Sequence, residues 1–372
     1  MLSRTLVVAQ KELLQLRRDR MTLAMMIALP LLQLMLFGYA INTDVRHIPT
    51  VVFDQDVSAE SRDLARSLEA TGFYDLVGEM RSYAEIERAL GSGSARVALV
   101  VPPRYASDLT RGQPTSLQLV VDGSDPQVVA SATHTAASLV AARSAGLAVL
   151  ALPVGGTLDR IRLEPTIWYN PDLRTAVYVV PGLVGVILTM TMVMLTAMAI
   201  ARERERGTLE QLIVSPVRRL ELIAGKILPY VAIGYVQMTL ILLLGRWVFD
   251  VPVVGSLLSL YALAFVFISA NLALGLFFST VARTQQQAMQ MSFFFLLPNI
   301  LLSGFMFPFE SMPGPAQWLG QALPLTHFLR IVRGIVLRGV GVRELWLELV
   351  WMAGILGVLV SLASLRFSKK LA

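Results

Sequence analysis

The sequence predicts an α-helical polytopic membrane protein with an α/β domain inserted on one side of the membrane. Of the 372 residues, 55% are hydrophobic and only 16% are charged, and the apolar residues gather in long blocks. A soluble protein of this length would carry about a quarter charged residues, and such blocks are the length that a bilayer requires. The segment 42–174 differs, because it alternates short strand-like and helix-like runs.

Six apolar blocks are predicted to cross the membrane, since each supplies about the 20 residues that one transmembrane helix needs. They are residues 21–41, 175–200, 227–249, 256–279, 288–307 and 345–365. The first block could instead be a secretory signal, because arginines precede it, but no small-residue cleavage pattern follows it. Residues 1–20 carry Leu6, Leu13 and Leu16 on one helical stripe, which predicts an amphipathic interfacial helix, with a plain anchoring flank as the alternative.

The bias of Lys and Arg between loops predicts that both termini are cytoplasmic and that 42–174 is periplasmic. Basic residues precede the first block and recur in the loop 201–226 and in the tail 366–372. The segment 308–343 does not fit this bias. The topology puts the segment outside, although it contains Arg330, Arg333, Arg338 and Arg343. Either the segment dips into the membrane or the span count is wrong, and the sequence assigns no role to these arginines.

The segment 42–174 reads as a small α/β domain. Strands are expected at 48–54, 95–101, 117–121 and 163–169, and helices at 61–70, 83–90 and 127–152. The runs 95–101 and 117–121 are continuously apolar, which is typical of strands buried on both faces. We therefore expect helices on both faces of the sheet.

Several chemistries are disfavoured. The chain has neither a G-x-x-x-x-G-K-[ST] nor a G-x-G-x-x-G loop, so we expect no ATP hydrolysis and no catalytic residues in it. It has no cysteine, and His47, His134 and His327 are far apart in sequence, so we expect ordinary surface or boundary histidines and no metal site. The predicted spans hold almost no ionisable residues, which disfavours an ion-coupled carrier. No nucleic-acid partner is indicated.

The loop 201–226 is the most informative segment. Thr208 and Gln211 stand in the spacing of a capping box, which predicts a short helix there. Ser215 and Pro216 would end it and begin a second helix leading back to the membrane at Gly225. We interpret the loop as a rigid elbow on which a partner could act; the alternative is a solvated positive-inside loop with no partner.

The same loop resembles the coupling region of ABC-2 type permeases, the membrane subunits of bacterial ABC exporters. The resemblance rests on Glu203, Glu205, Gly207, Thr208, Leu209, Glu210, Leu212, Ser215, Pro216, Gly225 and Lys226. It is greatest to the multidrug-efflux branch, which has a large external domain after the first span. It implies a type V exporter-like arrangement, and it implies that 308–343 forms short re-entrant helices on the outer side.

The resemblance also implies the partners. A separate ATP-binding subunit, which would hold ATP and Mg²⁺, is expected beneath each elbow, with a second permease copy or homologue opposite; a periplasmic adaptor is a further candidate. Glu203, Glu205 and Glu210 are the expected polar contacts with the ATPase, and interface charges of this kind favour register and association rate. Alanine at position 210 is expected to uncouple hydrolysis from transport.

The sequence says less about the substrate. Met194, Gln290 and Phe294 are candidates for a substrate path, since soft and aromatic side chains adapt to varied apolar cargo, although such residues more often face lipid or pack. The function favoured is export of small hydrophobic or amphipathic molecules across the bacterial inner membrane. The alternative is a non-transporting receptor or assembly scaffold whose external α/β domain binds a partner.

Overall fold

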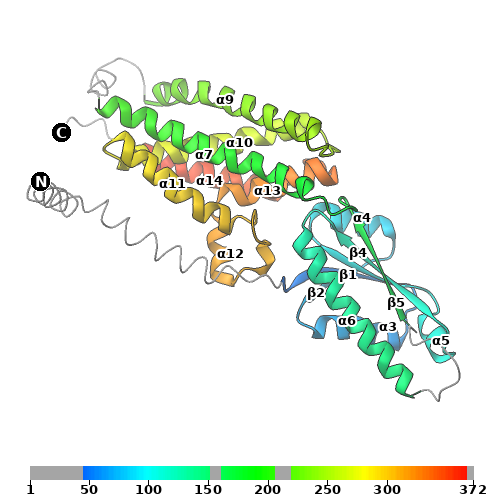
Figure 1. Ribbon diagram of the computed structural model, residues 1–372. Helices are drawn as coiled ribbons and strands as arrows, with labels where there is room; N and C mark the ends of the chain where they lie inside the picture. Colours follow the sequence, from blue (N-terminus) through cyan, green and yellow to red (C-terminus); the bar gives the residue numbers. More distant parts are fainter. Residues whose placement is uncertain (1–44, 151–160, 206–218, 367–372) are drawn as a thin grey trace, which may run out of the picture. The chain divides into compact units, whose positions relative to one another are not determined.

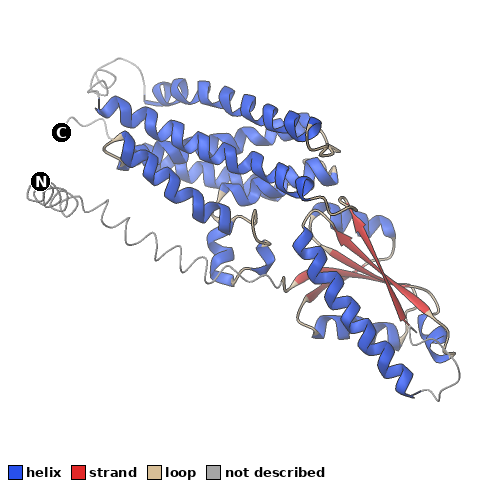
Figure 2. Ribbon diagram, in the orientation of Figure 1, coloured by secondary structure: helices blue, strands red, loops and turns tan. Residues whose placement is uncertain are grey.

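The structure is a computed structural model that describes residues 45–150, 161–205 and 219–366. The predicted segments 1–20 and 21–41, the middle of the elbow and the tail 367–372 lie outside the described residues. Within them the chain forms an α/β unit followed by a set of long helices, shown in Figures 1 and 2.

The α/β unit is built on a five-stranded sheet in the order β2-β1-β3-β4-β5. Its strands are β1 (Ile48–Asp54), β2 (Tyr74–Glu79), β3 (Val97–Val101), β4 (Thr115–Asp122) and β5 (Ile161–Trp168). All neighbours are parallel except β3 and β4, which pair antiparallel. The four predicted strands are confirmed to within two residues at their ends. The sequence analysis missed β2.

Helices cover both faces of this sheet, as the buried runs predicted. They are α3 (Ala59–Ala70), α4 (Tyr83–Ser92), α5 (Tyr105–Thr110) and α6 (Pro126–Leu150). Alternate residues of β3 enter different cores: Leu99 packs with residues of α3 and α6, whereas Val100 packs with Ile86 and Leu90 of α4. The two faces therefore have separate hydrophobic cores.

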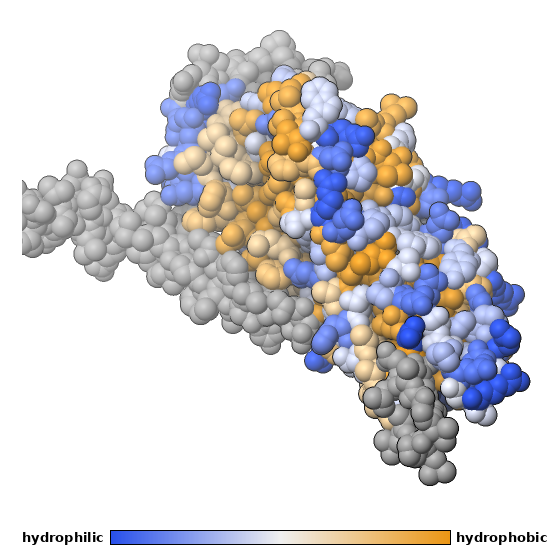
Figure 3. Space-filling view, turned by 45° about the vertical axis from the view of Figure 1, so that its right-hand side comes forward, coloured by the Kyte–Doolittle hydropathy of each residue, from blue (hydrophilic) through white to orange (hydrophobic). Residues whose placement is uncertain are grey.

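Five long helices follow. They are α7 (Thr175–Glu205), α9 (Arg219–Trp247), α10 (Leu257–Val281), α11 (Gln285–Leu302) and α14 (Trp346–Arg366). In the described part of the chain, four stretches are long and apolar enough to cross a membrane: α7, Pro229–Trp247 of α9, α10 and α14. The helix α11 is long enough but is not among them, because its four glutamines lower its mean hydropathy. Figure 3 shows apolar side chains gathered over these long helices.

Close packing of α10 and α7 explains why small residues occur in these helices. A Cβ at Gly275 of α10 would lie 2.5 Å from the backbone oxygen of Val193 in α7, so only glycine permits this approach. Further along α10, the ring of Phe267 stacks on Phe328, with ring centroids 4.0 Å apart. The helix α10 therefore contacts both α7 and α13.

Three helix boundaries differ clearly from the predictions, and the largest difference is that α9 begins at Arg219 rather than at residue 227. The helix α7 continues to Glu205 rather than ending at residue 200, because the charged residues 202–205 form its last turn. The helix α11 ends at Leu302 rather than 307, since Gly304 adopts a left-handed φ of 83° there. Four short helical segments occupy the region 308–343: η1 (Phe309–Ser311), α12 (Gly314–Gln321), α13 (Pro324–Arg333) and the π-helical turn η2 (Gly334–Arg338).

Candidate functional site

The coupling motif predicted from the sequence is only partly described. Glu203 and Glu205 lie on the last turn of α7, not in a loop, and Gly225 and Lys226 lie within α9. The other motif residues lie outside the described residues, and with them the predicted capping box and corner: Gly207, Thr208, Leu209, Glu210, Leu212, Ser215 and Pro216. The motif contacts that can be described are therefore those at the end of α7.

This end of α7 is bound to the start of α11. The Glu205 carboxylate accepts hydrogen bonds from the backbone N–H of Gln285, at 2.8 Å, and from its side-chain amide, at 2.5 Å. Arg202 donates to the Gln285 side chain at 3.2 Å, and Arg204 donates to the Ala282 carbonyl at 2.6 Å. We call these five residues the α7–α11 clamp.

The clamp has a clear electrostatic basis. The first N–H groups of a helix have no partner within it and carry partial positive charge, so a carboxylate is well placed at that end. Thr284 caps α11 by accepting from the N–H of Gln287 at 3.1 Å, and Glu205 satisfies the N–H of Gln285. Hydrogen bonds therefore fix the end of α7 to the start of α11.

The predicted substrate-path residues lie on the two helices that the clamp joins. Met194 is on α7, Gln290 and Phe294 are on α11, and all three side chains are half-buried. The two helices pack against each other along their length. Nearby Phe293 and Met289 of α11 are exposed. The role of these side chains remains a prediction.

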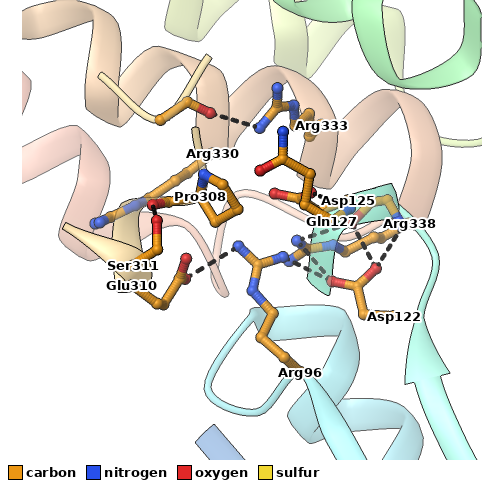
Figure 4. A network of polar contacts seen from close by, with 12 residues as sticks. Arg96, Asp122, Asp125, Gln127, Pro308, Glu310, Ser311, Arg330, Arg333 and Arg338 are labelled. Atoms are coloured by element: carbon orange, nitrogen blue, oxygen red, sulfur yellow. Dashed lines mark hydrogen bonds and ion pairs between the residues drawn. The ribbon is translucent and has the colours of Figure 1, made fainter. Parts of the chain in front are cut away.

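A second polar cluster joins the α/β unit to the short helices, and Figure 4 shows it from close by. Its centre is Asp122 at the end of β4, which is fully buried. Its carboxylate lies 2.7 Å from Arg96 Nη1 and 3.0 Å from Arg338 Nη2. Arg96 also reaches Glu310 of η1 at 3.4 Å. We call Arg96, Asp122, Glu310 and Arg338 the ionic joint.

The charges of the ionic joint compensate one another. Burial alone would raise the pKa of Asp122, but Arg338 and Arg96, together with hydrogen bonds from Ser124, outweigh it and hold the pKa below its ordinary value. Arg338 also donates to the Gly91 carbonyl at 3.4 Å and to Ser124 at 3.3 Å. The two arginines therefore favour the ionised form of Asp122.

The ionic joint accounts for part of the arginine excess that the sequence analysis left unexplained. Arg338 pairs with Asp122, and Arg330 pairs with Glu348 of α14 at 3.1 Å. Arg333 is buried against the Tyr178 ring, 4.2 Å from its centroid, and donates to the Gly304 carbonyl. Arg343 is exposed. Two of the four positive charges are thus neutralised by carboxylates of distant segments.

His327 differs from the prediction of an ordinary surface or boundary histidine, because it is fully buried between α13 and α14. Its Nε2 lies 2.9 Å from the Gln321 carbonyl and its Nδ1 lies 2.5 Å from the Glu348 carboxylate. Its ring stacks on Trp351. A carbonyl oxygen only accepts, so Nε2 is the donor in its contact with Gln321. The contact with Glu348 ties α13 to the first turn of α14.

Sequence reasoning missed the ionic joint. It assigned no role to Asp122, Arg96 or Glu310. The available signal was the arginine excess itself, because basic residues in an external segment require carboxylate partners if they are buried. The sequence did not show where those partners lie, since Asp122 is more than 200 residues from Arg338.

Comparisons with known proteins identify the family of the chain. Residues 20–365 match the family model described as ABC-2 family transporter protein. The chain is 30% identical over 346 residues to the probable multidrug ABC transporter permease YbhR of Escherichia coli K12, covering 93% of each chain. It is 29% identical to YbhS of the same strain, which bears the same description, covering 88% of this chain and 87% of that one.

Proposed function

Because the chain belongs to the ABC-2 family of transporter proteins and is an ABC transporter permease, we propose that it moves small hydrophobic or amphipathic molecules outward, drugs among them. The observation that carries the proposal is the α7–α11 clamp, in which the coupling motif binds a second helix of the permease. A permease depends on a separate ATP-binding subunit, and the clamp is a route by which a push from that subunit would reach the membrane helices. The multidrug descriptions of YbhR and YbhS support the substrate class.

Contacts between helix ends support a topology in which α11 also crosses the membrane. Arg174, just before α7, donates to the Phe249 carbonyl just after α9. The N–H of Gly255, before α10, donates to the Ile335 carbonyl of η2. The ionic joint attaches η1 and η2 to the α/β unit. These ends lie on one side, which requires an even number of crossings between Arg174 and η1.

The helices α7, α9 and α10 supply three crossings, so α11 has to supply the fourth. The α7–α11 clamp, which joins the opposite end of α7 to the start of α11, agrees with this count. The 18 residues of α11 rise about 27 Å, close to the thickness of a bilayer core. With 21–41 as a further span, α14 is the sixth, both termini are cytoplasmic and the α/β unit is periplasmic.

The proposed transport cycle involves the ATP-binding subunits, the clamp and α11. Two permease chains face each other, and closure of ATP-binding subunits beneath them moves the segments that follow Glu205. The clamp passes this movement to α11, along which the predicted path residues Gln290 and Phe294 lie. A periplasmic adaptor that contacts the α/β unit would extend the route outward.

Export is tested with the permease and its ATP-binding subunit in inside-out vesicles. We expect ATP-dependent accumulation of a fluorescent hydrophobic amine, and loss of accumulation when the catalytic glutamate of the ATPase is replaced. Accumulation that follows an imposed proton gradient without ATP would contradict the proposal. A permease that purifies from membranes without any ATPase would favour the receptor or scaffold alternative.

Topology is tested by cysteine labelling, because the natural chain has no cysteine. Single cysteines replace three exposed residues, Gln113, Arg283 and Arg343. On intact cells with a permeable outer membrane, an impermeant maleimide is expected to label positions 113 and 343 at once. Position 283 should react only after the inner membrane is opened. Equal labelling of 283 and 343 on intact cells would show that α11 does not cross.

A further inference from the structure

Arg333, the last residue of α13, holds the end of α11 that lies opposite the clamp. Its Nη1 donates to the carbonyl of Gly304 at 3.2 Å, two residues beyond α11. Its guanidinium lies over the ring of Tyr178 at the start of α7, and the hydroxyl of that tyrosine donates to the Phe305 carbonyl at 2.7 Å. The segment after α11 is thereby fastened to α13 and α7.

The hydrogen bonding of Arg333 is incomplete. Its side chain is buried, with the residue 8% exposed, yet Nε and Nη2 have no hydrogen-bond acceptor among the described residues. Unpaired buried donors are rare in native structures and call for an explanation. A guanidinium has five N–H donors, so a single carbonyl and an aromatic face do not satisfy it.

A carboxylate for which the described part of the chain supplies no ion pair lies nearby. Asp125, at the start of α6, is 4% exposed and accepts the N–H of Gln127 at 3.0 Å. It lines a cavity of about 30 Å³ together with Arg333, Arg96 and Glu310. Figure 4 shows Asp125 and Gln127 between Arg333 and the ionic joint. Burial raises the pKa of Asp125, although the positive charges of Arg333 and Arg96 oppose this.

We propose that Arg333 is a positioning residue of the transport cycle that exchanges the Gly304 carbonyl for the Asp125 carboxylate. In the arrangement described here, Arg333 holds the outer end of α11 against α13. When the clamp displaces α11, Gly304 leaves, and Arg333 turns into the cavity to bind Asp125. A charge-assisted hydrogen bond is stronger than one to a neutral carbonyl, so the second arrangement is stabilised once α11 has moved.

The outer end of α11 would therefore have two positions, one with Arg333 bound to the Gly304 carbonyl and one with Arg333 bound to Asp125. Gly182 of α7 makes room for the Phe305 ring next to Gly304, since a Cβ at position 182 would lie 2.5 Å from that ring. The ionic joint keeps Asp125 in reach, because it holds the α/β unit to η1 and η2 next to α13. The inference rests on the proposed function, since it assigns a residue to the outward step of transport.

The test uses the full permease–ATPase complex in vesicles with three variants. Asp125→Asn removes the second acceptor's charge with little change of shape, Arg333→Lys keeps the positive charge, and Arg343→Gln is the matched control at an exposed arginine. We expect Asp125→Asn to lower transport about tenfold, the effect of one lost charge-assisted contact. ATP hydrolysis should stay within about twofold, because the clamp is intact. Arg333→Lys should retain part of the transport, and the control all of it.

A distance measurement separates positioning from general damage to the fold. Spin labels are placed on cysteines at two exposed positions, Met306 just after α11 and Trp346 at the start of α14. Trapping the natural chain with ATP is expected to lengthen this distance, and Asp125→Asn should abolish the change. Normal transport with an unchanged distance shift in Asp125→Asn would overturn the inference. Absence of ATP-driven transport by the natural chain would instead overturn the proposed function.

Discussion

The α7–α11 clamp and the ionic joint use the same chemistry in opposite surroundings. In the clamp, a water-exposed carboxylate accepts from the first residue of a helix. In the ionic joint, a fully buried carboxylate sits between two arginines that are themselves mostly buried. Water competes for an exposed contact and screens it, whereas a buried charge that loses its partner has no substitute. Loss of one partner is therefore expected to cost more stability in the ionic joint than in the clamp.

The largest effect is expected from breaking one side of the ionic joint. Arg338→Ala leaves the charge of Asp122 under-compensated in a buried site, which costs about 3–5 kcal/mol when a buried pair loses one partner. The unfolding temperature of the purified complex should fall, and protease cleavage between the α/β unit and η2 should rise. Adding Asp122→Asn to this variant should recover part of the loss. An unchanged unfolding temperature in Arg338→Ala would mean that the contact does not hold the α/β unit.

Lowering the pH should weaken the ionic joint over a defined pH range. The pKa of Asp122 is lowered by folding from its ordinary value of 3.8, so its contribution is complete above that pH and is lost as the pH falls through the lowered value. The excess stability of the natural chain over Asp122→Asn should therefore be constant from pH 7 to about pH 4 and shrink below it. Thermal unfolding at stepped pH measures this difference. A difference that shrinks already between pH 7 and 5 would contradict the assignment of an ionised Asp122.

The smallest effect is expected at Arg343. This residue is exposed and lies in the same segment as the three arginines with partners. Arg343→Gln should alter the free energy of unfolding by no more than about 0.5 kcal/mol, the usual range for a surface change. Chemical unfolding of the complex provides the comparison with Arg338→Ala. A loss as large as that of Arg338→Ala would show that burial does not distinguish the arginines.

Most of the α/β unit could be predicted from the sequence, because its buried strands are local apolar runs. The residues of β3 are buried at every position, and that continuous pattern identified the strand. The strand β2 was missed for the converse reason: it is an edge strand, contains Gly78, and alternates buried or half-buried positions with exposed ones over only six residues. A short half-exposed edge gives a weak sequence signal.

The polar sites were less predictable, because their partners are distant in sequence. The motif identified Glu205, but its acceptor role depends on Gln285, to which the sequence analysis assigned no role. The charges of residues 202–205 were taken to mark a loop, whereas they complete the last turn of α7. Arg96 and Glu310 meet only because the sheet and the short helices bring them together. Tertiary structure, not local pattern, determined each of these contacts.

The clamp is the contact on which the account of coupling depends, and the ratio of transport to ATP hydrolysis in Glu205→Gln tests it most directly. Glutamine keeps the size of the side chain but removes the charge that binds the start of α11. With Glu164→Gln as an exposed carboxylate control, we expect the Glu205 variant to assemble and hydrolyse ATP while its transport per ATP falls severalfold. Unchanged transport per ATP in Glu205→Gln would contradict the account.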